Sequence, residues 1–157
     1  MTRESLEHLL HQYRAGLDAE LALLRQLEQL ASRQRDLTDV RDLDAFGGVG
    51  DERERVTSNL LAIEETLRVT RDALKCEGAP VRALPDYSSV ADLHRRVSDL
   101  VARILDTDKA SLQILADADR LRRAALAGLQ RGESTLKAYR RTLAPTTEPA
   151  ALVNNRW

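Results

Sequence analysis

Residues 6–31 read LEHLLHQYRAGLDAELALLRQLEQLA, and their apolar side chains recur at alternating steps of three and four. This spacing places apolar side chains on one face of an α-helix and is typical of a coiled-coil seam. Glu20 is the seam position at which a charged side chain breaks the pattern. The stretch predicts a long helix that packs against other helices. Its seam consists of Leu6, Leu10, Tyr13, Leu17, Leu24, Leu27 and Ala31.

Two further segments repeat the same spacing. One contains Val56, Leu60, Ile63, Leu67 and Leu74; the other contains Val90, Leu93, Val97, Leu100 and Ile104. No segment alternates with the period of two that a half-buried strand requires. The sequence therefore predicts helices near 3–46, 52–77 and 88–143. A break in the first helix near Asp36 stays open as an alternative.

A glycine-rich stretch, DAFGGVGDERERV, spans residues 44–56 and allows two interpretations. It could be a phosphate-binding loop, or it could be the connection between two helices. No predicted strand precedes it, no Gly-Lys-Ser/Thr follows, and Arg53 stands where a dinucleotide-binding fingerprint needs glycine. We therefore expect a hinge. Gly47 and Gly48 would end the first helix, and Asp51 would cap the second, with Glu54 completing a capping box.

The second connection also carries stop and start signals. Gly78 follows a helix-like stretch and is expected to end the second helix. Pro80 and Pro85 are expected to keep the next residues extended. Ser89 is then a suitable N-cap for the third helix.

These elements predict an all-α fold: an elongated antiparallel three-helix coiled-coil bundle with a long C-terminal helix that extends as an arm. Residues 1–143 would form one helical coiled-coil domain, and 144–157 a flexible tail. Because the second helix is the shortest, it would leave two apolar stripes uncovered. The first stripe is the start of the first helix, with Leu6, Leu9, Leu10, Tyr13 and Leu17.

The second uncovered stripe lies on the C-terminal arm and is the candidate partner-binding site, because exposed apolar stripes usually mark interaction surfaces. The arm is basic: residues 118–143 hold seven Lys/Arg and two Asp/Glu, whereas residues 1–77 hold 11 basic and 16 acidic side chains. We expect the arm to bind an acidic partner helix or to fold back on its own acidic body. An anionic membrane surface is a less favoured third target. The candidate binding residues are Leu121, Ala125, Leu126, Leu129, Leu136, Tyr139 and Leu143.

Composition argues against several other classes of function. The formal net charge is −1 and aromatic residues make up 3% of the chain, unlike a typical nucleic-acid-binding protein. His8 and His11 lack the spacing of metalloprotease or di-iron motifs, and no Ser/His/Asp grouping is evident. The start of the sequence has no signal-peptide core, and no apolar run is long enough to span a membrane. We expect a soluble cytoplasmic protein that is not an enzyme and needs no metal or cofactor.

The order of the segments resembles a known family. A Leu/Glu/Arg-rich first helix is followed by DLDAF, then by ERERVTSNLLAIEETL, and the last helix ends in STLKAYRR. This pattern resembles the flagellar type III export chaperones of the FlgN type. The resemblance implies that the chain binds the C-terminal helices of hook-filament junction (hook-associated) proteins and delivers them to the type III export apparatus. It also implies that the C-terminal region binds the substrate.

One alternative stays open. The same apolar stripes would suit a self-associating structural or scaffold coiled-coil protein, in which two copies cover each other's exposed ends as a symmetric homodimer.

Overall fold

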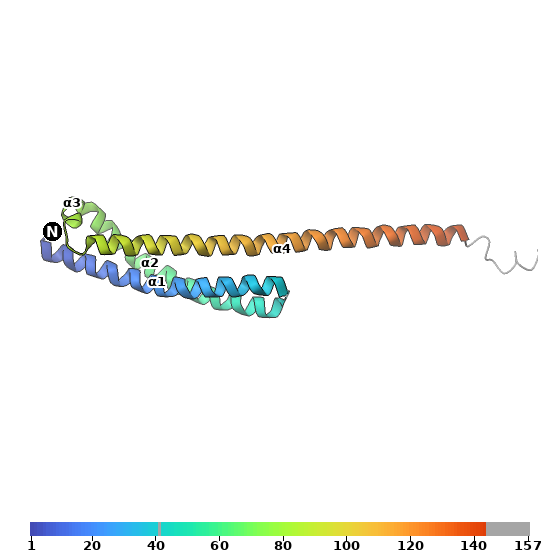
Figure 1. Ribbon diagram of the computed structural model, residues 1–157, viewed down its shortest axis with the longest axis horizontal. Helices are drawn as coiled ribbons and strands as arrows, with labels where there is room; N and C mark the ends of the chain where they lie inside the picture. The colour runs from blue at the N-terminus through green and yellow to red at the C-terminus, as the bar shows by residue number, and fades with distance from the viewer. Residues whose placement is uncertain (41, 144–157) are drawn as a thin grey trace, which may run out of the picture. The chain divides into compact units, whose positions relative to one another are not determined.

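The computed structural model describes residues 1–40 and 42–143, and it is helical throughout apart from short connections. Within these residues there is no β-strand. The all-α helical bundle predicted from the sequence, with a long C-terminal helix, is therefore confirmed. The helices are α1 (Arg3–Val40), α2 (Leu43–Glu77), α3 (Ala79–Arg82) and α4 (Tyr87–Leu143) (Figure 1).

The chain divides into two compact units, residues 1–114 and the residues from Leu115 onward. The first unit contains α1, α2, α3 and the first part of α4, and it holds the hydrophobic core. The second unit contains the rest of α4. The predicted flexible tail, 144–157, lies outside the described residues and stays a prediction.

The core of the first unit is the predicted seam. All seven apolar seam residues of α1 are buried, and Leu17 and Leu100 are the largest side chains that are almost completely enclosed. Burial of a large apolar side chain contributes about 1.5–3 kcal/mol, so this seam dominates the stability of the unit. The other helices and the α3–α4 connection supply Leu67, Leu74, Val81, Leu84, Val90, Leu93, Val97, Leu100 and Ile104.

Contacts between helices define their directions within the first unit. The Tyr13 hydroxyl lies 3.1 Å from Nδ1 of His94, and Glu28 pairs with Arg103 further along both helices. The residue numbers in both helices rise from the first pair to the second, so α1 and the start of α4 run parallel. Figure 1 shows α2 beside α1, and the chain reverses between the end of α1 at Val40 and the start of α2 at Leu43, so α2 is antiparallel to both. This matches the predicted order of directions.

The glycine hinge predicted between the first two helices is wrong. Helix α1 ends at Val40 and α2 begins at Leu43, so Gly47, Gly48, Asp51 and Glu54 all lie inside α2. The N-cap of α2 is Asp42, whose carboxylate accepts a hydrogen bond from the Ala45 backbone N–H at 3.0 Å. An Asp cap stabilises a helix start by about 1 kcal/mol. Asp42 therefore fulfils the role that the sequence interpretation gave to Asp51.

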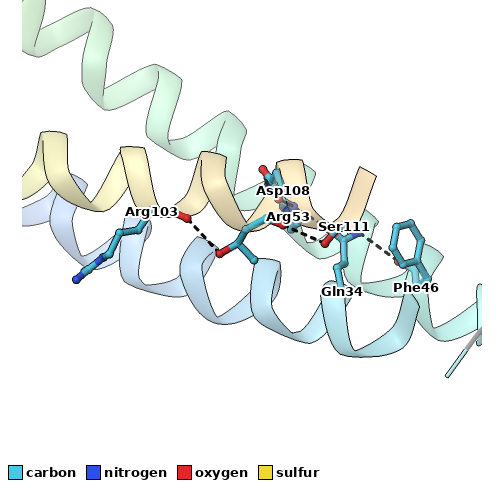
Figure 2. A network of polar contacts seen from close by, with 7 residues as sticks. Gln34, Phe46, Arg53, Arg103, Asp108 and Ser111 are labelled. Carbon is cyan, nitrogen blue, oxygen red and sulfur yellow. Dashed lines mark hydrogen bonds and ion pairs between the residues drawn. The ribbon is translucent and has the colours of Figure 1, made fainter. Parts of the chain in front are cut away.

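Burial and polar contacts explain why the helix includes its glycines. Because α2 begins at Leu43, Val49 lies within the helix, and its side chain is buried. Arg53 donates to Gln34 Oε1 at 2.8 Å and to both carboxylate oxygens of Asp108 at 2.6 and 2.8 Å, and Figure 2 shows these side chains turned toward one another. This network joins α1, α2 and α4. Such tertiary contacts outweigh the cost of about 1 kcal/mol for each helical glycine.

The position of this turn also corrects the prediction that the start of the first helix is uncovered. Leu6, Leu10, Tyr13 and Leu17 are 1–7% exposed, and Leu9 packs against the core as a partly buried side chain. Moving the turn toward the N-terminus brings the C-terminal end of α2 beside the start of α1. The short helix α3, which the sequence analysis did not foresee, adds further cover (Figure 1).

The second connection follows its prediction in part. Gly78 ends α2 with a φ of 56°, a backbone conformation that favours glycine. Pro80, however, lies in the first turn of α3 and not in an extended segment, because proline fits the first positions of a helix. Helix α4 begins at Tyr87, so Ser89 is inside it and is not its N-cap.

The revised position of the turn predicts the effect of alanine at its glycines. A Cβ atom added at Gly47 or Gly48 would meet no atom within 4 Å. We expect Gly47→Ala and Gly48→Ala each to raise the free energy of unfolding by about 0.5–1 kcal/mol, because alanine is the better helix former. Urea denaturation followed by circular dichroism measures this change.

Gly78→Ala is the matched control, because Gly78 has the positive φ that a hinge glycine would have. This variant should lower the free energy of unfolding by about 1 kcal/mol. Destabilisation by all three substitutions would mean that residues 47–48 form a left-handed turn.

Candidate partner-binding surface

The predicted binding residues lie in the second unit, on residues 115–143 of α4. Five large apolar side chains there are 55–73% exposed: Leu121, Leu126, Leu129, Leu136 and Tyr139. Ala125 is exposed as well. Leu143 is the last residue of α4, and its side chain lies outside what the structure describes. In the same chain, the apolar seam of α1 is almost fully buried.

Helical geometry places most of these residues on one face. At 3.6 residues per turn, the positions of Leu121, Ala125, Leu129, Leu136 and Tyr139 fall within an arc of roughly 80°. Leu126 lies about 60° beyond one edge of this arc. Gly132 falls within it and leaves a shallow gap between two apolar groups. We use the name α4 apolar face for Leu121, Ala125, Leu126, Leu129, Leu136 and Tyr139.

Basic side chains surround the α4 apolar face. Arg123 pairs with Asp119 at 2.7 Å, and Lys137 pairs with Glu133 at 2.8 Å, both within the helix. Four other arginines of residues 118–143 form no ion pair within the described chain: Arg122, Arg131, Arg140 and Arg141. Their guanidinium groups are exposed and can pair with carboxylates of another molecule.

A second candidate feature is a polar cluster inside the first unit, around the seam-breaking Glu20. Glu20 is only 5% exposed and forms a hydrogen bond with the Glu64 carboxylate. Burial, followed by this hydrogen bond and the nearby negative charge, raises the pKa of Glu20 to about 7. Arg71 donates to Glu64 Oε1 at 2.7 Å and holds the pKa of Glu64 below its usual value. Protonated Glu20 thus donates its hydrogen bond to an ionised Glu64 carboxylate.

Tyr13 completes the cluster on the side of α4. Its hydroxyl contacts His94 as well as Arg71, and burial raises the pKa of this phenol. The cluster contains no Ser, Thr or Cys beside a base, so it lacks the arrangement of a nucleophilic site. Its polar groups satisfy one another across α1, α2 and α4, which indicates a role in fixing the helix register.

Residues 1–40 and 42–143 contain neither a candidate metal cluster nor a candidate membrane span. No group of three or more His, Cys, Asp or Glu side chains there is arranged to hold a metal ion. None of the helices in that range is long and apolar enough to cross a membrane.

No protein-family model, no curated protein and no solved structure matches this chain.

Sequence reasoning found the α4 apolar face and marked Glu20 as unusual, but it missed the partners of Glu20. Glu64 and Arg71 lie seven residues apart on α2, which is the heptad spacing that puts two side chains on one face. That spacing was a usable signal. Because the turn between the first two helices was predicted too late in the chain, the register that brings both residues to Glu20 could not be predicted.

The polar cluster predicts a pH-dependent stability. Between pH 4.5 and about 7, folded Glu20 keeps a proton that the unfolded chain releases. The free energy of unfolding should therefore fall as pH rises through this interval, by on the order of 2–3 kcal/mol. Below it, protonation of Glu64, whose pKa is lowered, should reduce stability again. Urea titrations at half-unit pH steps measure both limbs.

Glu20→Gln is the control, since an amide keeps a donor for Glu64 but does not titrate. This variant should lose the decline between pH 4.5 and 7 and be more stable than the natural chain at pH 8. A decline of equal size in both proteins would assign the titration to other groups.

Proposed function

We propose that this protein is a chaperone that binds an amphipathic helix of a partner protein on the α4 apolar face. The observation that supports this proposal most directly is the exposure of five large apolar side chains, at 55–73%, within one helix. Soluble proteins seldom leave such a patch uncovered unless it binds something. A helix laid along an apolar stripe is a common mode of peptide recognition.

The charge around this face favours an acidic partner. Residues 118–143 carry a net charge of +5, from seven basic and two acidic side chains. The four arginines without an intrahelical partner would pair with carboxylates that flank the apolar stripe of the bound helix. These charges speed the encounter and reject basic segments, while the apolar contacts supply most of the affinity.

The kind of partner is proposed from the family resemblance alone. A chaperone of the FlgN type would hold the C-terminal helices of a hook-associated protein in the cytoplasm and deliver them to the flagellar type III export apparatus. The exposed face lies in the C-terminal region, where that resemblance puts substrate binding. Neither a cofactor nor a catalytic residue has a part in this function.

Self-association is the competing function, since a second copy of α4 could cover the same face. Two copies would bring together two segments of net charge +5, and like charges at an interface oppose association. The acidic partner helix is therefore favoured over the homodimer.

The α4 apolar face predicts which substitutions weaken partner binding. We expect Leu129→Asp and Leu136→Asp each to lower the affinity for the purified C-terminal segment of a hook-associated protein by about 30-fold or more. A charge at the centre of a desolvated helix interface costs about 2 kcal/mol or more. Isothermal titration calorimetry measures the affinity, and circular dichroism checks that helix content is retained.

Leu105→Asp is the matched control, because Leu105 is 61% exposed on the first unit's part of α4. It should bind the segment as the natural chain does. Unchanged binding by the Leu129 and Leu136 variants would rule out this face as the site. If light scattering instead shows a dimer that these two variants dissociate, the protein is the self-associating coiled coil.

A further inference from the structure

A cavity lies inside the first unit, at the end where α2 stops and α4 begins. Its volume is ≈ 470 Å³, and its lining comes from α1, α2, α3 and α4. Leu74, Val81 and Val90 form an apolar wall and are themselves buried. Cavities of about 300–1,000 Å³ with mostly apolar walls are typical of small-molecule sites. The cavity is independent of the α4 apolar face.

The charged groups around this cavity all have the same sign. Arg71, Lys75 and Arg82 line it, and none of its lining residues in the described chain is acidic. This is unexpected in the first unit, residues 1–114, which has 21 acidic and 16 basic side chains. The cavity therefore presents a local positive charge on an otherwise acidic segment.

Two of these three cations are free to bind a ligand. Arg71 already pairs with Glu64 at 2.7 Å, so its charge is largely compensated. Lys75 and Arg82 are exposed and form no ion pair within the described residues. They come from the last turn of α2 and from α3, on either side of Gly78. The connection through Gly78 and Pro80 thus places two cations at one opening.

Two further polar groups line the cavity. They are the Tyr13 hydroxyl and the His94 ring, 3.1 Å apart. A few polar groups in an apolar pocket fix the orientation of a ligand, while the apolar wall supplies contact area. An α-helix is about 10–12 Å across with its side chains, so a cavity of this volume suits a small molecule better than a partner helix.

We propose that this cavity binds a small amphipathic carboxylate, an anion with an aliphatic chain of medium length. The chain lies against Leu74, Val81 and Val90, and the carboxylate is held by Lys75 and Arg82. Apolar burial and charge pairing both contribute to binding, so a neutral analogue binds more weakly and a cationic analogue does not bind.

Calorimetry with three probes of equal chain length tests the proposal on the full chain: decanoate and decyltrimethylammonium, each below its micellar concentration, and decanol below its solubility limit. We expect decanoate to bind at one site, decanol at least about tenfold more weakly, and the cation not at all. Amide chemical shifts of Val81 and Ala91 should move with decanoate. Equal binding of all three probes, or shifts confined to residues 115–143, would overturn the proposal.

Matched variants separate charge from shape. The double variant Lys75→Gln/Arg82→Gln should lower decanoate affinity by about tenfold or more, the effect of losing roughly 1.4 kcal/mol, and leave decanol binding unchanged. Lys109→Gln, which removes a charge from the exposed surface of α4, should have no effect.

Ala91→Phe tests the shape of the cavity, because Ala91 lines it and a phenyl ring would fill it. This variant should bind neither decanoate nor decanol. If it fails to fold, the charge variants still decide, and unchanged decanoate affinity in the Lys75/Arg82 variant would sink the proposal.

Discussion

The packing of the α1 seam, from Leu6 to Ala31, against α2 is the constraint on which the rest of the structure depends. Gly16 lies opposite Leu67, and Gly50 lies opposite Gln34. In each pair the two residues are nearly equally far along the chain from the connection between Val40 and Leu43. If the turn lay seven residues later in the chain, each α1 residue would face an α2 residue about twice that number of positions further along. The start of α1 would then be exposed. Each exposed large side chain would cost about 1.5–3 kcal/mol. Helical glycines at about 1 kcal/mol each are the smaller penalty.

The polar cluster reinforces the same register. Glu20 and Glu64 are also nearly symmetric about the turn, so the pairing that covers the seam brings these carboxyl groups together beside Arg71. A slip by one heptad would leave Glu20 buried without these partners, and an unpaired buried carboxyl group costs far more than a paired one. An apolar residue at position 20 would stabilise the core equally well, but it would not select one register. We therefore interpret Glu20 as a determinant of register more than of stability.

The sequence predicted what depends on local periodicity and missed what depends on register. Heptad spacing identified which side chains of α1 and of residues 115–143 share one face, because spacing alone determines the face of a helix. Whether that face is covered depends on register, and Leu6, Leu10 and Leu17 are buried although they were predicted to be uncovered. Heptad spacing could not choose between Asp42 and Asp51 as the N-cap, since both are equally good caps locally and the choice is made by Val49 and Arg53 through contacts with other helices. The cavity at Val81 was missed for the same reason, because its walls come from four separate helices.

The two apolar stripes of this chain differ in how their stability arises. The α1 seam is stabilised by its own core, so it needs no other molecule. Residues 115–143 bury few side chains, and Gly128 and Gly132 each cost the helix about 1 kcal/mol. Helical stability in proteins comes mostly from packing an apolar face, which here is exposed. A bound helix would supply that packing, and it would stabilise residues 115–143 by the same contacts that give it affinity. Under the proposed function, partner binding and the stability of this part of α4 are therefore coupled.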